Sequence, residues 1–192
     1  MSFSLKGYTP TLAGLLSTTP AALYERQRAL VRAGLLDAGD GRGPGSGVRA
    51  TAPSTALLLL SVLATEHLSE TERRVSALAM MRPARSTRCP FTEMTTFVDA
   101  FAVLLSQLAK AALVSEVKVS RTADRAQILF RDLEDNRKPK ISEFVGANSK
   151  EPAIAVVATL GAQVLLRIAK DVRGAFEDAP AVVEHVKSRR RA

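Results

Sequence analysis

Two short helix-forming stretches, separated by a tight turn and followed by a glycine-rich loop, occupy the first quarter of this 192-residue chain. Leu12, Leu15 and Leu16 recur at the spacing that covers one face of a helix. After the turn at residues 17–19, Pro20 suits the start of a second helix, because the N–H that it lacks is unpaired in a first helical turn anyway. We therefore expect a second helix over residues 20–33, packed against the first.

The two sides of this second helix differ in chemistry. One side carries residues that can meet the first helix, namely Leu23, Gln27, Leu30 and Val31. The opposite side carries a small residue near the start and charged residues further on, namely Ala21, Glu25, Arg28 and Arg32. Gly34 then ends the helix in the usual manner. The plain alternative is an amphipathic helical hairpin with a solvated outer face.

Residues 39–47 contain five glycines and one proline, so they cannot form a helix. Arg42 lies within this loop, and Arg49 follows the loop after Val48. Glycines let a backbone approach phosphates closely, and the arginines supply positive charge. The loop lacks the Gly-Lys-Ser/Thr ending of a nucleotide-binding loop, and no apolar strand precedes it. A flexible linker is the alternative.

Helix, turn, helix and basic loop, in this order, are what a winged helix-turn-helix needs to lie in the major groove of DNA. We expect the DNA contacts to come from the turn, the second helix and the loop, namely from Thr18, Thr19, Ala21, Glu25, Arg28, Arg32, Arg42 and Arg49. A glutamate can accept a hydrogen bond from cytosine and an arginine can bind guanine, each with about 1–3 kcal/mol of discrimination. The net charge of +8 also favours a polyanionic partner.

The rest of the chain predicts a second, smaller unit. Residues 55–64 are apolar on all sides, so we expect a buried helix there, followed by another helix over residues 69–81. The basic, proline-bearing stretch 82–90 is the best candidate for a boundary. The second unit is expected to contain a helix over 91–113, two short strands over 117–119 and 127–130, a charged loop over 131–140, a short element over 141–145 and a long helix over 149–176.

We therefore predict a mainly α fold with a small β-hairpin, in the α+β class. The expected organisation is a winged helix-turn-helix domain over residues 1–82, a helix-hairpin-helix module for dimerisation or partner binding over 91–180, and a basic disordered tail over 181–192. Gly161 and Ala162 are small enough to allow close packing of a second subunit.

Several classes of protein are disfavoured. The lone Cys89 excludes a disulfide framework, and with only His67 and His185 besides, both expected at the surface, we expect neither a metal nor another cofactor. Asp132, Glu134 and Asp135 lie among basic residues and indicate a solvated loop, so we expect no enzyme. With no signal region and no apolar run long enough to span a bilayer, a cytoplasmic location and no membrane partner are expected.

Residues 12–63, about a quarter of the chain, resemble the DNA-binding domain of the MerR group of transcription factors. The resemblance rests on the helix 12–16, the helix 19–33, the sequence Gly34-Leu35-Leu36, the glycine-rich loop and the helix 57–63. It implies that the second helix enters the groove and that the loop, as a wing, contacts phosphates. The wing lacks the family's aromatic and arginine residues, and both the long coiled-coil helix and the inducer-binding cysteines are missing, so ligand sensing is not implied.

The glycine-rich wing, with its small α+β module, is also similar to phage-derived regulators and to the activators of gene transfer agents. Our leading hypothesis is a sequence-specific regulator that binds double-stranded DNA, with RNA polymerase or a DNA-bending protein as further partners. A homodimer would imply a palindromic operator. The alternatives are an adaptor for RNA polymerase or a phage assembly, and a DNA-recognition subunit of a phage packaging machine.

Overall fold

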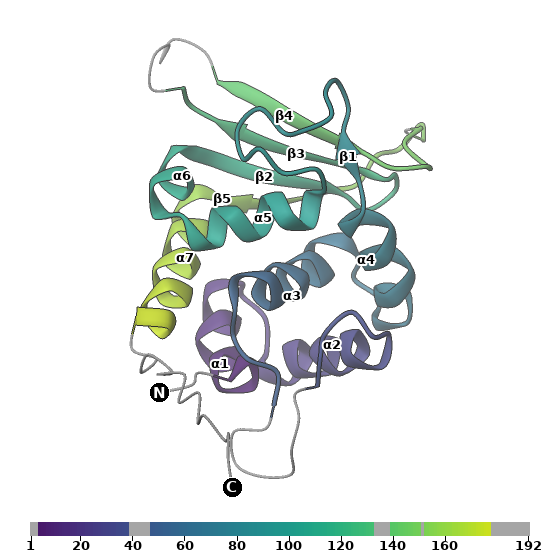
Figure 1. Ribbon diagram of the computed structural model, residues 1–192. Coiled ribbons are helices and arrows are strands. Elements are labelled where there is room, and N and C mark those ends of the chain that lie inside the picture. The colour runs from purple at the N-terminus through teal and green to yellow at the C-terminus, as the bar shows by residue number, and fades with distance from the viewer. Residues whose placement is uncertain (1–3, 39–46, 133–138, 151, 178–192) are drawn as a thin grey trace, which may run out of the picture.

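The computed structural model describes residues 4–38, 47–132, 139–150 and 152–177, and it has an α+β fold (Figure 1). The helices are α1 (Leu5–Leu15), α2 (Pro20–Arg32), α3 (Ala52–Ala64), the short 3-10 helix η1 (Leu68–Glu70), α4 (Thr71–Ala79), α5 (Phe97–Ser106), α6 (Leu108–Leu113) and α7 (Ala162–Glu177). The strands are β1 (Arg82–Pro83), β2 (Val114–Ser120), β3 (Arg125–Phe130), β4 (Lys140–Val145) and β5 (Val157–Gly161).

The five strands form one antiparallel sheet in the order β1-β4-β3-β2-β5. The β2–β3 hairpin lies at its centre, with Val117 opposite Ile128 and Val119 opposite Ala126. Side chains alternate between the two faces of a strand. In β3 this alternation buries Ala126, Ile128 and Phe130. One face of the sheet is therefore apolar and must be covered.

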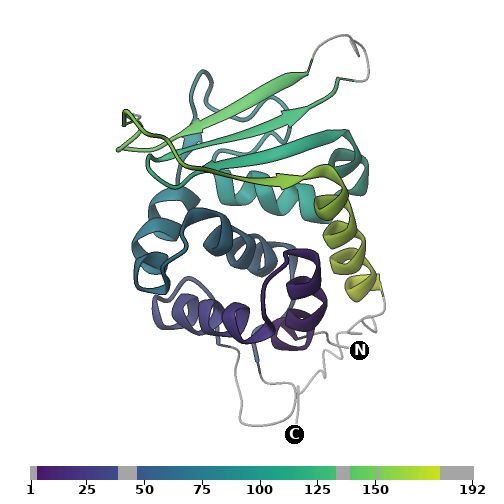
Figure 2. The same ribbon diagram turned by 180° about the vertical axis from the view of Figure 1, so that it is seen from behind.

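The helices supply that cover. Phe97 on α5 packs against Phe144 on β4, with the ring centroids 5.2 Å apart, and α6 and α7 contact β2. The opposite face of the sheet carries charged pairs, Glu116 with Lys118 and Arg125 with Glu143. Viewed from behind, in Figure 2, the strands stand above the N-terminal helices, with α7 descending at one side.

Helix α3 is the centre of the helical part. Its apolar sequence faces neighbours on all sides, since it contacts α2, α4, α5, α7, β2 and β5. A capping box fixes its start, because the Thr51 hydroxyl accepts from the Ser54 N–H while the Ser54 hydroxyl accepts from the Thr51 N–H. The prediction of a buried helix in this region is confirmed.

Several other sequence predictions are confirmed. The second helix, predicted over 20–33, runs over Pro20–Arg32 with Ala33 as its C-cap, and the predicted hairpin corresponds to β2 and β3. His67 is exposed, as expected. The helix predicted over 69–81 is present in shorter form as α4.

Two predicted elements are wrong in type or extent. Residues 149–161 were expected to begin a long helix, but residues 157–161 form the strand β5, and α7 begins only at Ala162. The apolar spacing of Ile154, Val157 and Gly161 fits a helix, yet adjacent β-branched residues and a free edge of β2 favour a strand. The helix predicted over 91–113 is likewise shorter, because it begins only at Phe97, and it is divided at Gln107 into α5 and α6. The small hairpin is thus the middle of a five-stranded sheet.

The stretch 82–90, expected as a boundary, belongs to the fold. Arg82 and Pro83 form β1 and pair with β4, while Cys89, expected to be an incidental linker thiol, is buried. A continuous hydrophobic core extends from Leu5 in α1 to Val172 in α7. The division of the chain into units over 1–82 and 91–180 stays a prediction, and the tail 181–192, Glu134, Asp135 and His185 lie outside the described residues.

In the part of the chain that the structure describes, no helix combines the length and the apolar character needed to cross a membrane.

Candidate nucleic-acid interface

Helix α1 is held in place at its first turn. The Ser4 hydroxyl caps it by accepting the Gly7 N–H at 3.0 Å. Pro10 lies inside the helix and cannot donate to the carbonyl of Lys6, but the Thr9 hydroxyl donates to that carbonyl at 2.7 Å. The helix therefore continues through its proline without leaving this carbonyl unsatisfied.

The turn between α1 and α2 is tight. Ser17 has φ of 52°, the left-handed conformation in which glycine is usual, and the Thr18 N–H donates to the Ala13 carbonyl at 3.0 Å. Thr19 then caps α2, because its hydroxyl accepts the Ala22 N–H at 3.2 Å. The turn and cap fix the angle between the two helices and leave Thr19 exposed at the start of α2.

Helix α2 turns one face inward and one outward, as predicted. Leu23, Gln27 and Leu30 are buried. Ala21, Arg28 and Arg32 are exposed, and the Glu25 side chain between them is 43% exposed. Residues at this spacing follow one line along a helix. The residues proposed to read bases therefore share one accessible face.

Arg28 and Glu25 form an ion pair on this face, with 2.9 Å between Nη1 and Oε1. The Arg28 side chain is 54% exposed, and an exposed pair of this kind contributes only about 0–1 kcal/mol. Its guanidinium carries further N–H donors besides the one used by Glu25. The pair therefore orients Arg28 but can open at little cost when a stronger acceptor arrives.

Helix α2 ends in a glycine cap. Gly34 has φ of 69°, its N–H donates to the Val31 carbonyl at 3.0 Å and the Leu35 N–H donates to the Leu30 carbonyl at 2.9 Å, which is the Schellman arrangement. The polypeptide continues to Leu36, which is buried. Residues 39–46, with Arg42, lie outside the described residues.

Arg49 is placed by a small β-bridge. It pairs with Ser4 in antiparallel fashion, and the adjacent Leu5 N–H donates to the Val48 carbonyl at 2.7 Å. Val48 and Ala50 are buried, whereas Arg49 between them is exposed. The segment after the glycine-rich loop is therefore fixed against the start of α1, with its arginine directed to solvent.

A lysine that the sequence analysis did not single out lies between these two groups. The Lys6 ammonium is 5.0 Å from the centroid of the Tyr24 ring, which joins the first turn of α1 to the middle of α2. Lys6 is exposed and follows Arg49's partner Ser4 by two residues. The sequence analysis placed the first helix at residues 12–16, so it gave no signal for Lys6, and the contact with Tyr24 depends on how the helices pack.

Arg26 fixes α2 to the rest of the protein. Its guanidinium donates to the carbonyls of Ser61, Thr65 and Glu66 at 2.5, 2.9 and 3.1 Å. These carbonyls lie at and beyond the end of α3, where a helix leaves acceptors unpaired. Burial lowers the pKa of Arg26, and the neighbouring Arg121 lowers it further.

Arg121, after β2, reaches the same end of α3. Its Nε–H donates to the Leu63 carbonyl at 3.2 Å and its guanidinium pairs with Glu66. Two arginines from α2 and from the β2–β3 turn therefore meet at one helix end. The sequence offered a signal for Arg26, since it lies between Leu23 and Leu30 on the inward side of α2, and none for Arg121.

The structure thus brings together most of the predicted residues. Thr19, Ala21, Glu25, Arg28 and Arg32 follow α2 from its cap to its last turn, and Thr18 is half-buried just before the cap. Arg49 lies apart, at the start of α1. The side chains exposed here are hydrogen-bond donors and cations, together with the carboxylate of Glu25. Among the described residues, no group of three or more His, Cys, Asp or Glu side chains is placed to hold a metal ion.

Comparison of the chain with models of protein families, with curated proteins and with solved structures finds no match in any of the three.

Proposed function

We propose that this protein is a sequence-specific regulator of transcription that binds double-stranded DNA. One observation carries the proposal: the exposed residues of α2 form a single line that begins at a capped helix start, while the other side of α2 is fixed to α3 by Arg26. A rigidly mounted helix with a free polar face is what major-groove recognition requires.

The order of elements gives further support. A helix, a tight turn, a second helix, a glycine-rich basic segment and two further helices are the parts of the proposed winged helix-turn-helix, and their order agrees with the resemblance to the MerR group. Arg49 would contact the phosphate backbone from the wing, with Lys6 beside it. Such contacts add affinity without reading sequence. From the similarity of the glycine-rich wing and the α+β module to phage-derived regulators, we propose a phage-related activator that acts with RNA polymerase or a DNA-bending protein.

Binding of the full chain to random-sequence duplex DNA, followed by selection, tests the proposal. In about 0.15 M salt, the wild type should enrich one motif. Arg28→Ala should blur one position of that motif, because a bidentate contact to guanine is worth about 1–3 kcal/mol. Arg73→Ala, which removes an exposed arginine from α4 instead, is the matched control and should leave the motif unchanged.

The salt dependence of binding tests the wing separately. Arg49→Ala should weaken binding to all sequences alike and reduce the salt slope by about one charge. Binding without an enriched motif would contradict a sequence-reading helix and leave a role on the DNA backbone, as in packaging. Absence of DNA binding would overturn the proposal in favour of a protein adaptor.

A further inference from the structure

The two edges of the sheet are built differently. A strand edge presents unpaired N–H and C=O groups, and proteins usually protect such edges with prolines, charges or very short strands. Here one edge is β1, which has only two residues, Arg82 and Pro83. The loop after it also contacts β4, because the Ala84 N–H donates to the Glu143 carbonyl at 2.9 Å. β1 and this loop therefore cover the edge of β4 at Glu143, Phe144 and Val145.

The other edge, β5, has none of these protections. Among the described residues, no strand pairs with β5 on the side away from β2. The segment that leads into β5 and the strand itself expose apolar side chains: Ile154 is 79% exposed and Val157 is 50% exposed. Figure 2 shows β5 along the border of the sheet. In the part of the chain that the structure describes, this edge is open to another strand.

The register shows which backbone groups point outward. The Arg121 N–H donates to the Val156 carbonyl at 2.8 Å, in continuation of the β2–β5 pairing. Hydrogen-bonded positions alternate along an antiparallel pair. Ala158 is therefore bonded to β2, whereas the N–H and C=O groups of Val157 and Thr159 point away from the sheet.

The charge of the edge indicates what covers it. The sequence has no charged residue between Glu151 and Arg167, although 24% of the chain is charged and its net charge is +8. An acidic partner would be drawn to the basic surfaces elsewhere. Two copies of this chain repel each other over most of their surfaces, and an uncharged edge is where they can meet without like charges in contact.

We infer that β5 pairs with β5 of a second copy, in antiparallel fashion, to join two five-stranded sheets into one. Such pairing is isologous, so the same patch serves both subunits and the assembly closes at two. Val157 and Thr159 donate to and accept from the second copy, and Ile154 adds apolar contact. The dimer goes beyond the proposed DNA binding and does not depend on it.

The test adds charge to the edge. Val157→Lys/Thr159→Lys and Val157→Glu/Thr159→Glu each place like charges across the interface, while a mixture of the two variants places opposite charges there. Like charges opposite each other destabilise a strand pair, so we expect the dissociation constant of each variant to rise at least about tenfold. The mixture should regain a heterodimer. Ser86→Lys/Thr87→Lys, at exposed positions near the protected edge, is the matched control and should dimerise as the wild type does.

Sedimentation velocity of the full chain without DNA, from low to high micromolar concentration, gives the readout, with circular dichroism to show that each variant is folded. The inference is supported if the wild type forms a dimer, if the lysine variant and the glutamate variant each dimerise at least about tenfold more weakly when alone, and if their mixture forms a dimer. A wild type that stays monomeric overturns it. So does a lysine variant that dimerises as tightly as the wild type, or a mixture of folded variants that stays monomeric.

Discussion

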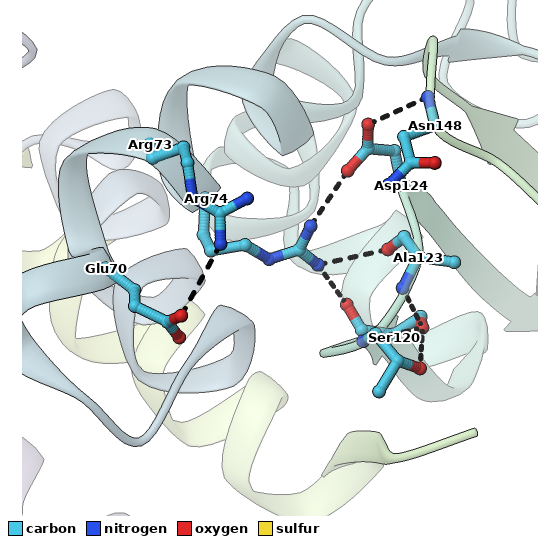
Figure 3. A network of polar contacts seen from close by, with 8 residues as sticks. Glu70, Arg73, Arg74, Ser120, Ala123, Asp124 and Asn148 are labelled. Carbon is cyan, nitrogen blue, oxygen red and sulfur yellow. Dashed lines mark hydrogen bonds and ion pairs between the residues drawn. The ribbon is translucent and has the colours of Figure 1, made fainter. Parts of the chain in front are cut away.

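Arg74, on α4, and Asp124, directly before β3, form an ion pair that solvent hardly reaches (Figure 3). The Nη1 and Oδ1 atoms are 2.8 Å apart, and the side chains are 5% and 10% exposed. Arg74 also donates to the carbonyls of Ser120 and Ala123, and the second carboxylate oxygen accepts the Asn148 N–H. Helix α4, the β2–β3 turn and the segment after β4 are thus joined at one buried point.

Asp124→Asn should strongly destabilise the fold. The substitution keeps the shape but leaves the Arg74 charge buried without its partner, and loss of one member of a buried pair costs about 3–5 kcal/mol. Arg73→Gln, at the preceding position of α4, removes an arginine that is 70% exposed and should change the free energy of unfolding by about 0–1 kcal/mol. Urea unfolding of both variants measures their free energies of unfolding. If Asp124→Asn lost less stability than Arg73→Gln, the result would contradict a structural role of the Arg74–Asp124 pair.

Gly146→Ala should destabilise the same region. A Cβ at residue 146 would lie 2.8 Å from the Cβ of Asp124 and 3.2 Å from the Cγ of Met81. Since both neighbours are held in the core, we expect a cost of about 1–3 kcal/mol from overpacking. Gly14→Ala, in α1, meets no atom within 4 Å and should stabilise by about 0.5–1 kcal/mol. Thermal unfolding should show a lower melting temperature for Gly146→Ala and a higher one for Gly14→Ala than for the wild type. A shift of both melting temperatures in the same direction would contradict the close packing around Gly146.

Ser17→Gly should stabilise the turn between α1 and α2. Ser17 has a positive φ, which costs a residue other than glycine about 1 kcal/mol or more, and the substitution removes that strain. Gly34→Ala is the reciprocal change, because Gly34 also has a positive φ, and it should destabilise by about 1 kcal/mol. Chemical unfolding checks both. A destabilised Ser17→Gly variant would show that the serine side chain has a role in the turn that outweighs its strain.

The first helix was predicted only over residues 12–16, whereas α1 begins at Leu5. The helices α2 and α3 could be predicted because their signals are local. Pro20 and Thr19 mark the start of α2, Gly34 marks its end, and the spacing of Leu23 and Leu30 gives its inward side. The same rules predicted the burial of α3 from its uninterrupted apolar sequence. None of these inferences requires knowledge of residues far away in the chain.

The sheet could not be predicted to the same extent, because its outer strands depend on distant partners. β5 has a helix-like apolar spacing and becomes a strand through its pairing with β2. β1 has two residues and is defined only by β4. For the candidate site, the exposed face of α2 followed from periodicity, whereas the contacts of Lys6 with Tyr24 and of Arg26 with the end of α3 arise from packing between helices.

Tyr8→Phe should change how stability depends on alkaline pH. The Tyr8 hydroxyl donates to Asp171 Oδ2 at 3.1 Å, joining α1 to α7. Burial, and then the Asp171 carboxylate, raise the pKa of Tyr8 well above its ordinary value. Above about pH 10 the unfolded chain loses this proton while the folded chain keeps it, so the free energy of unfolding falls by about 1.4 kcal/mol per pH unit.

The contribution of Tyr8 is therefore complete below about pH 10 and is lost as the pH rises from there toward the folded pKa. Tyr8→Phe has no proton to lose, so the stability of the wild type relative to the variant should fall between about pH 9 and about pH 11. Urea unfolding of both proteins at these pH values measures this. A difference that stays constant with pH would contradict the raised pKa.

Glu25→Gln should alter DNA binding without affecting the fold. The Glu25–Arg28 pair is exposed, so its loss should change the free energy of unfolding by less than about 1 kcal/mol. Removal of the only carboxylate on the outer line of α2 should strengthen binding to all sequences several-fold and reduce discrimination at the base that Glu25 reads. Glu93→Gln, at an exposed position before α5, makes the same change in net charge elsewhere. Fluorescence titration with the selected and a scrambled duplex compares them, and an equal gain from Glu93→Gln would mean that α2 is not the surface that meets DNA.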